Sequence, residues 1–322
     1  MRSGRMCRVC VVKGDGLLKY SFPPPHPFNS GRVVRFWEEL QGSDLGERLI
    51  EPERADEQVL ALFHDKGHIE FVKKASTLGY GFLDEGDTPA FVGVLEAAEL
   101  AVGSTLACVE KVLNGEADHG FNPVGGLHHA RPDRSAGFCV FNDIGVAIET
   151  LRRRGLERVL YVDIDVHHGD GVFYPFEYDR NVFIFDVHED GRFLYPGTGK
   201  EIETGEGRAV GTKVNVPLLP GEGDERLKEI LPVLEEFAVK AAPDFIILQS
   251  GADGIAGDPI GGLSFSVGLH SRVTELLHQA AHKQCGGRLV ALGGGGYDPV
   301  NCAKAWTAVV RELARGPKTK NA

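Results

Sequence analysis

RVLYVDIDVHHGDG, residues 158–171, is the stretch that decides the fold of this chain. It begins as a short apolar run, which is typical of a buried β-strand. It ends with three aspartates and two histidines within the eight positions 163–170. An isolated buried charge is costly, so carboxylates persist in an interior only when they are paired, hydrogen-bonded or bound to a metal ion. The stretch therefore predicts a buried strand that ends at a polar site.

The rest of the chain alternates short apolar runs with longer amphipathic ones. Five apolar runs are expected to form strands: 7–12, 158–166, 181–187, 245–250 and 288–293. Runs with helical spacing cover residues 89–113, 143–154, 224–241, 270–283 and 300–314. Asp143 is expected to cap the second of these helices, and Pro299 to start the last. Buried strands that alternate with helices indicate a mostly parallel sheet covered on both faces, so we predict one α/β domain over residues 1–322.

Polar residues follow four of these strands where each apolar run ends. They are HHGDG after 158–166, HED after 181–187, GADG after 245–250 and GGGGY after the last strand. In open α/β sheets, ligands bind at the carboxyl ends of the strands. Because these ends converge on one rim, the sequence predicts a single active site there, with loops and helices of residues 20–90 around it.

The bulk composition argues against some classes of function. The chain has 322 residues and a formal net charge of −11, which disfavours direct nucleic-acid binding and is compatible with a cationic substrate. No stretch is apolar and long enough to suggest a membrane span. The six cysteines are scattered and do not resemble a disulfide framework, so a cytoplasmic location is expected. Cys7 and Cys10 form a C-x-x-C pair without a second Cys or His pair nearby, and we interpret them as reduced thiols in a strand.

Three polar residues of the opening stretch are expected on one face of its strand. Side chains alternate along an extended segment, which groups Asp163, Asp165 and His167. Carboxylates and imidazole suit a hard-to-borderline divalent ion such as Zn²⁺, and three protein ligands leave one position for water or substrate. Asp253, among small residues after another strand, is the natural third ligand. The alternatives are that one acid orients a histidine, or that the cluster is a hydrogen-bond network without metal.

Two further segments carry candidate catalytic groups. His128 and His129 lie in GGLHHARPDRSAGFCVFND, residues 125–143, and need acids to orient them. A histidine held in one tautomer beside a metal ion provides the base that water activation requires. Tyr297 follows four glycines in LGGGGYDP, residues 292–299, which suggests a phenol on a mobile loop that could donate to a developing oxyanion. Asp258 is either a loop cap or a member of the site.

Five motifs, in this order along the chain, resemble those of the zinc-dependent histone deacetylase superfamily. They are HHARPDRSAGFCVFND, YVDIDVHHGDG, PGTG at 196–199, GADGIAGDP and GGGGYDP. This superfamily includes prokaryotic acetoin-utilisation proteins and acetylpolyamine amidohydrolases. The resemblance runs from HPFNSGR, residues 26–32, to the last helix. It implies the arginase/deacetylase fold, a central mostly parallel sheet flanked by helices, with the active site at the carboxyl ends of the strands.

The resemblance also implies a set of bound ions. Asp165, His167 and Asp253 would bind one Zn²⁺ per chain, and Fe²⁺ is an alternative native metal. A structural K⁺ is implied near Asp163, Asp165 and His167.

Catalytic roles follow from the same resemblance. His129 is similar to the general base that takes a proton from the attacking water, with Asp170 supporting it. His128 is similar to the electrostatic partner beside that base, with Asp163 supporting it. Tyr297 would hydrogen-bond the acetyl carbonyl and then its oxyanion.

The residues expected to contact substrate show departures from the family pattern. Gly137 and Phe138 resemble one wall of a narrow acyl-lysine channel. Tyr195 would form the opposite wall, where phenylalanine is commoner. Ile260 stands where a polyamine-selective relative carries a glutamate gatekeeper, and an apolar residue there weakens the polyamine interpretation.

The leading hypothesis is therefore zinc-dependent hydrolysis of an acetylated amine, with acetyl-lysine in a protein as the favoured substrate. The alternative within the same chemistry is an acetylpolyamine or another small acylated amine. A binding module without turnover and an arginase-like binuclear manganese hydrolase are the competing classes. The sequence leaves open the acyl chain length, the oligomeric state, the native metal and the acid at the rim of the channel, for which Asp84 and Asp87 are the candidates.

Overall fold

The computed structural model describes residues 6–43 and 48–317. Within these ranges one sheet of eight strands has the order β2-β1-β3-β8-β7-β4-β5-β6, and each neighbouring pair is parallel. The strands are β1 (Val9–Val12), β2 (Arg48–Ile50), β3 (His119–Asn122), β4 (Val159–Asp163), β5 (Val182–Glu189), β6 (Lys213–Leu218), β7 (Phe245–Gln249) and β8 (Leu289–Leu292). This confirms the predicted fold, a parallel sheet flanked by helices.

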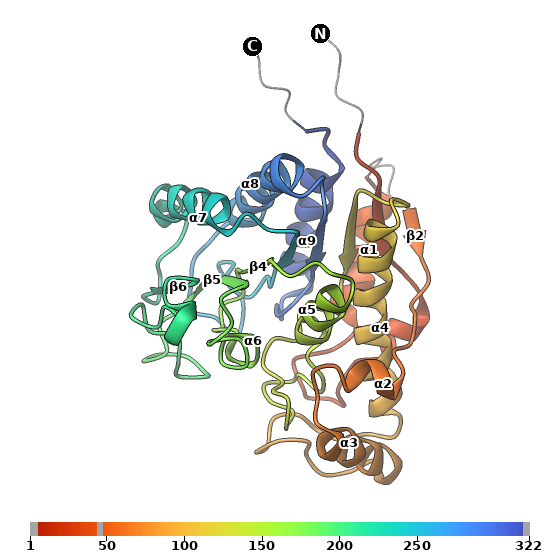
Figure 1. Ribbon diagram of the computed structural model, residues 1–322. Coiled ribbons are helices and arrows are strands. Elements are labelled where there is room, and N and C mark those ends of the chain that lie inside the picture. The colour runs from red at the N-terminus through yellow and green to blue at the C-terminus, as the bar shows by residue number, and fades with distance from the viewer. Residues whose placement is uncertain (1–5, 44–47, 318–322) are drawn as a thin grey trace, which may run out of the picture.

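Helices cover both faces of the sheet, as Figure 1 shows. They are α1 (Gly31–Gln41), α2 (Glu57–Leu60), α3 (Lys66–Leu78), α4 (Val94–Leu113), α5 (Asp143–Arg153), α6 (Asp170–Phe173), α7 (Leu227–Ala241), α8 (Gly268–Gln284) and α9 (Pro299–Ala314). In one layer α1 packs on α9, α9 on α8 and α8 on α7, while α4 packs against β1, β3 and β8 and carries α5 and α3. No helix in the described part of the chain is long and apolar enough to cross a membrane.

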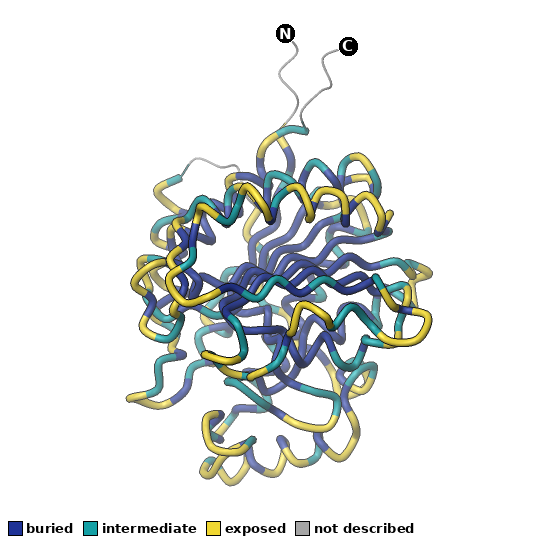
Figure 2. Tube along the Cα trace, turned by 90° about the vertical axis from the view of Figure 1, so that its left-hand side faces the viewer, coloured by how far each residue is buried: buried dark blue, intermediate teal, exposed yellow. Residues whose placement is uncertain are grey.

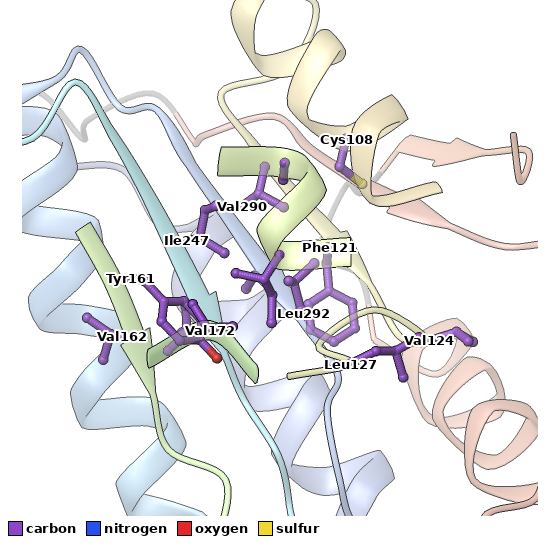
Figure 3. Packing of buried hydrophobic residues seen from close by; sticks show 14 of the residues in the cluster. Cys108, Phe121, Val124, Leu127, Tyr161, Val162, Val172, Ile247, Val290 and Leu292 are labelled. Carbon is purple, nitrogen blue, oxygen red and sulfur yellow. The ribbon is translucent and has the colours of Figure 1, made fainter. Parts of the chain in front are cut away.

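The core lies along the sheet because its strands are apolar on both faces. Figure 2 shows the strands as buried chain between partly exposed helices. Val159, Leu160 and Val162 of β4 are fully buried, and each such side chain contributes about 1.5–3 kcal/mol when it leaves water. Figure 3 shows Cys108 of α4 and Phe121 of β3 in the same apolar layer. Strands buried on both faces leave only their ends for polar chemistry.

Three strands were not predicted from the sequence. β3 reads HGFN and has no apolar run, and β2 is an edge strand of three residues. The other edge strand, β6, alternates buried and half-buried residues and contains a proline, which an edge strand tolerates. The parallel pairing of each with its neighbour comes from contacts distant in sequence. The predicted strand at 158–166 is three residues too long, because β4 ends at Asp163.

The ends of one helix also differ from the prediction. The side chain of Asn142, not that of Asp143, caps α5 by accepting a hydrogen bond from the Gly145 backbone at 2.9 Å. Asp143 is fully buried and instead accepts from the backbone of Gly126 and Leu127. It therefore fixes the loop that follows β3. Helix α9 begins at Pro299, as predicted.

The strand order decides where the polar loops meet. β3, β8, β7 and β4 are consecutive neighbours in the sheet. The loops at their carboxyl ends carry the two adjacent histidines, the glycine-rich segment, Asp253 and the DIDVHHGDG segment. Four stations far apart in sequence are thus brought to one place.

Candidate metal centre and active site

Two carboxylates and one imidazole form a compact buried group at the ends of β4 and β7. One ligand atom from each of Asp165, His167 and Asp253 lies within 4.8 Å of the other two. Nδ1 of His167 is 3.0 Å from Oδ1 of Asp165 and 3.3 Å from Oδ2 of Asp253. Asp165 and His167 lie in the bend after β4, not in an extended strand, so the alternation argument does not explain their common direction. The sharp loop brings them together instead.

Neighbouring groups hold the two carboxylates but leave one oxygen unused. Oδ2 of Asp165 accepts hydrogen bonds from Nε2 of Gln249 and the Gly295 backbone, both at 2.7 Å. Oδ1 of Asp253 accepts from the Val166 backbone at 3.0 Å. Oδ2 of Asp253 is buried and has no hydrogen-bond partner of normal geometry among the described residues, although Nδ1 of His167 lies 3.3 Å away. A buried polar atom without a partner is rare and indicates an ion or another missing ligand.

The surroundings of this group are shaped for close approach. A Cβ at Gly295 would lie 2.0 Å from Oδ2 of Asp253, and one at Gly251 would lie 2.1 Å from Oδ2 of Asp165. Burial and the neighbouring Asp165 raise the pKa of Asp253 to about 7. A bound cation would offset the electrostatic repulsion between two carboxylates held this close, and a donor set of two carboxylates and one imidazole suits Zn²⁺. The residues present therefore fit the metal that the sequence implied.

Each of the two adjacent histidines is oriented by its own aspartate. Nδ1 of His128 lies 2.7 Å from Oδ2 of Asp163, and Nδ1 of His129 lies 2.7 Å from Oδ1 of Asp170. An ionised carboxylate only accepts hydrogen bonds, so Nδ1–H donates in both pairs and Nε2 is left to face the site. Arg131 donates to the other oxygen of Asp170 at 2.7 Å.

The environments of the two histidines differ in charge. Burial alone would lower the pKa of His128, but Asp163 and Asp165 raise it to about 10. Burial and the neighbouring His128 lower the pKa of His129 to about 4. Titratable neighbours whose pKa values are pushed apart take different parts in acid–base chemistry.

The glycine-rich loop after β8 is anchored at both of its ends. Arg32 of α1 is buried and donates to the carbonyls of Gly294 and Gly296 at 2.8 and 3.2 Å. Oδ2 of Asp258 accepts from the Tyr297 backbone at 2.7 Å. Asp258 is thus a loop anchor that holds the phenol in position. Burial, Asp253 and Asp165 raise the pKa of Tyr297 well above its usual value, so its hydroxyl stays a donor at neutral pH.

Two neighbouring cavities lie at the candidate site. The inner one, of about 20 Å³, is lined by both histidines, Asp165 and His167, the glycine-rich loop, Phe28, Gly137 and Tyr297. It has room for about one water-sized group. The outer one, of about 460 Å³, includes Tyr195 and Asp87, and Gly137 lines both.

Aromatic rings surround the candidate site. The Phe138 ring is 5.9 Å from that of Tyr297, and the Tyr195 ring is 5.0 Å from that of His129. Phe138 has a φ of 68°, a left-handed conformation that a bulky residue rarely adopts. The Thr88 hydroxyl accepts from the Phe138 backbone N–H at 2.9 Å, and Tyr20 donates to its carbonyl at 2.8 Å. This hydrogen bonding holds Phe138 in the strained conformation.

The carboxylates of the two candidate rim acids, Asp84 and Asp87, differ in the hydrogen bonds that they already accept. Oδ1 of Asp84 accepts from three backbone groups of its own loop, at Gly86, Asp87 and Thr88. Asp87 is exposed and lies at the wall of the outer cavity. Burial of its carboxyl and the adjacent Asp84 raise the pKa of Asp87 to about 7. Both acids line the outer cavity, but the backbone of its own loop already occupies Asp84.

Some residues that the sequence grouped together are not part of this site. His188 of the HED segment is paired with Asp186 at 2.6 Å and the Gly199 carbonyl at 2.9 Å. Glu189 accepts from the Gly262 backbone at 2.7 Å. Among the described residues, Ile260 lines neither cavity. The end of β3 contributes in place of the end of β5.

Other residues near the site were missed by sequence reasoning. They are Arg32, Phe28, Arg131, Asp143 and Gln249. HPFNSGR contains Phe28 and Arg32 and HHARPD contains Arg131, but nothing in their local pattern indicates partners that lie 39 residues away for Arg131 and 262 for Arg32. Asp143 and Gln249 were assigned to a helix cap and to a strand.

Comparison with known proteins places the chain clearly. A model of the histone deacetylase domain matches residues 26–313. The acetoin utilization protein AcuC of Bacillus subtilis (strain 168) is 40% identical over 308 residues, covering 92% of this chain and 78% of that protein. AcuC of Staphylococcus aureus (strain MRSA252) is 33% identical over 97% of this chain and 83% of its own length. A solved structure, the crystal structure of the HDA15 HD domain, matches with a TM-score of 0.88 and 29% identity over 97% of this chain and 91% of that one.

Proposed function

The chain belongs to the histone deacetylase family, and from this premise we propose that it is a metal-dependent hydrolase that releases acetate from acetyl-lysine in proteins. The observation that carries the proposal is the convergence of three metal-binding side chains, two oriented histidines and one tyrosine on four neighbouring strand ends. Family membership and the AcuC relatives support deacetylation, while the choice of a protein substrate is the finer part of the proposal.

Asp165, His167 and Asp253 would hold one Zn²⁺, with Fe²⁺ as the alternative native ion. When bound, such an ion polarises the amide carbonyl and makes water more acidic, which stabilises developing charge by several kcal/mol. Gln249 and the Gly295 backbone fix the direction of Asp165. Ligand side chains that are already held in position need not be ordered when the ion binds, so binding costs less free energy.

His129 would act as the base. Its Nδ1–H is held by Asp170, so the lone pair on Nε2 is available to take a proton from the attacking water. His128, held by Asp163, would stabilise the negative charge that develops. The proton that the histidine pair takes up would then pass to the nitrogen of the leaving amine. Cleavage of an amide needs both water activation and protonation of the leaving nitrogen, so both pairs are required.

Tyr297 would stabilise the reacting carbonyl. Its hydroxyl remains protonated and its loop is anchored by Arg32 and Asp258. A donor fixed in advance at the place where charge develops is worth more than one that must reorganise.

The shape of the approach favours a single extended chain as substrate. Gly137 and Tyr195 line the outer cavity and the Phe138 ring packs near that of Tyr297, so these three residues would border the path of the substrate chain. Asp87 is proposed as the rim acid, because it is exposed at the outer cavity while Asp84 is occupied by its own loop, and it could accept backbone N–H groups of a peptide. Ile260 lines neither cavity and supplies no acidic contact for a polyamine.

Acetate release should be measured on an acetyl-lysine peptide and on acetylspermidine with the same enzyme. We expect a higher kcat/KM for the peptide than for acetylspermidine. In Asp87→Asn we expect KM to rise for the peptide but not for acetylspermidine. A preference for acetylspermidine would select the small-amine alternative. Tight binding of both compounds without acetate formation would overturn the hydrolase and favour a binding module.

Two accompanying assignments stay part of the proposal. A structural K⁺ is expected near Asp163, Asp165 and His167. A cytoplasmic location is expected because the six cysteines form no disulfide.

A further inference from the structure

A second group of metal-binding side chains lies at the opposite end of the sheet. Cys7 lies just before β1, His119 is the first residue of β3, and His278 and His282 are one turn apart in α8. One ligand atom from each of the four lies within 4.8 Å of all the others. The site of acetate release is at the carboxyl ends of the strands, so this cluster is separate from it. We propose that Cys7, His119, His278 and His282 form a structural site for Zn²⁺ or a similar borderline divalent ion.

The three distances among Cys7, His278 and His282 match those of a tetrahedral centre. Sγ of Cys7 lies 3.6 Å from Nε2 of His278 and 3.4 Å from Nε2 of His282. The two Nε2 atoms are 3.2 Å apart. A tetrahedral Zn²⁺ with its usual bond lengths to nitrogen and sulfur places neighbouring donors about 3.3–3.6 Å apart.

His119 gives the second, independent reason to expect an ion. It is fully buried, and neither of its ring nitrogens has a hydrogen-bond partner of normal geometry among the described residues. The Gly287 backbone lies near the ring, but it does not form a hydrogen bond of normal geometry with either nitrogen. Its ring meets those of His278 and His282 edge-on at 4.9 and 5.3 Å. A metal ion would satisfy one nitrogen, and the nearby backbone would suit the other, as is usual for a ligating histidine.

The composition of the cluster suits metal binding, because thiolate and neutral imidazole are the forms in which cysteine and histidine bind a metal ion. A cluster without metal could share protons among Cys7, His278 and His282, but that arrangement leaves His119 without a partner.

Four protein ligands leave no open position, which is the mark of a structural site. The ion would join the beginning of β1, the beginning of β3 and the end of α8. The Cys7 backbone also donates to the Ala314 carbonyl at the end of α9, at 3.1 Å. The ion would therefore hold Cys7, near the start of the described chain, close to α8 and to the end of α9.

Cobalt separates this site from the catalytic one. The proposed catalytic ligands contain no sulfur, whereas a thiolate bound to Co²⁺ gives a near-ultraviolet charge-transfer band. Tag-free protein loaded with Co²⁺ should show this band, and Cys7→Ser and His282→Ala should lose it. Cys10→Ser is the matched control and should retain it, because Cys10 lies beside Cys108 instead of the histidines.

Three results would overturn the proposal. The first is wild-type protein that binds Co²⁺ and keeps acetate release intact but shows no sulfur band, a result that does not depend on any variant folding. The band could survive Cys7→Ser. It could also disappear in Cys139→Ser, since Cys139 lines the inner cavity. A count of two metal ions per chain is not sufficient alone, because a binuclear catalytic centre would give the same number.

Discussion

Tyr297 lines the inner cavity from a loop, and its hydroxyl is the group that we propose stabilises charge on the reacting carbonyl. Tyr297→Phe removes one oxygen and keeps the ring that packs 5.9 Å from Phe138. We expect kcat to fall by about 10²–10³-fold, as for the loss of one oxyanion donor, with KM changed only a few-fold. Steady-state acetate release measures both.

Tyr178→Phe is the matched control, since Tyr178 is 69% exposed. It should keep the wild-type kcat. A Tyr297→Phe enzyme with undiminished kcat would remove the phenol from the mechanism.

Several site residues could be predicted because their chemistry is visible locally. Acids and histidines clustered directly after an apolar run mark Asp165 and His167 as candidates, and paired histidines require acids such as Asp163 and Asp170. Arg32 could not be found in this way. Its contact with the Gly294 carbonyl spans 262 residues, and an arginine in a helix is usually exposed.

Cys7 shows the same limit in the opposite direction. Its histidine neighbours are 271 and 275 residues away in the chain, so a search of the nearby sequence gave no partner. The interpretation of Cys7 as a plain reduced thiol rested on sequence distance, whereas parallel pairing of β1 with β3 determines its surroundings.

At the scale of elements, the loop between β8 and α9 depends on Asp258. Asp258→Ala removes the acceptor that holds the Tyr297 backbone and leaves the metal ligands untouched. A displacement of about 1 Å at a reacting group costs up to roughly 10²-fold. We expect kcat to fall by about 10–100-fold while bound metal stays at the wild-type level.

Asp244→Ala is the control for this change. Asp244 likewise accepts from two backbone groups, at Glu157 and Arg158, but at the other end of the sheet. Its loss should lower stability and leave kcat unchanged. Equal kcat values for Asp258→Ala and the wild type would show that the loop needs no such anchor.

The predicted elements were those whose pattern is strong within a single segment. The strands β4, β5, β7 and β8 and the helix α9 read directly from their apolar periodicity. The strand β3 could not be predicted in this way, because His119 and Gly120 break its apolar run. Its burial comes instead from its pairing partners β1 and β8. The loop with the two histidines therefore had no strand assigned before it.

At the scale of the molecule, buried histidines make stability depend on pH. Nε2 of His64 accepts from the Asn142 backbone at 2.8 Å and its Nδ1 donates to the Arg131 carbonyl at 3.1 Å. Burial and the neighbouring His68 lower the pKa of His64 to about 3. The unfolded chain, with a histidine pKa of about 6.5, therefore binds the proton more readily between these values. Stability is complete above pH 6.5 and falls as the pH drops toward 3.

His64→Gln keeps an acceptor and removes the titration. The slope of the free energy of unfolding against pH, measured by urea denaturation between pH 4 and 6, should fall by about 1.4 kcal/mol per pH unit. Other buried histidines and the metal ligands contribute equally to both proteins, so the difference belongs to His64. An unchanged slope would mean that His64 is protonated in the folded state.

The account rests on an ion held by Asp165, His167 and Asp253, and the direct test is acetate release from an acetyl-lysine peptide before and after metal removal. We predict that protein stripped by a chelator and dialysed loses activity by at least about 10³-fold, in line with several kcal/mol of lost charge stabilisation. Added Zn²⁺ should restore the activity in the wild type but not in Asp253→Ala. Wild-type turnover by protein whose measured metal content is negligible would contradict the account.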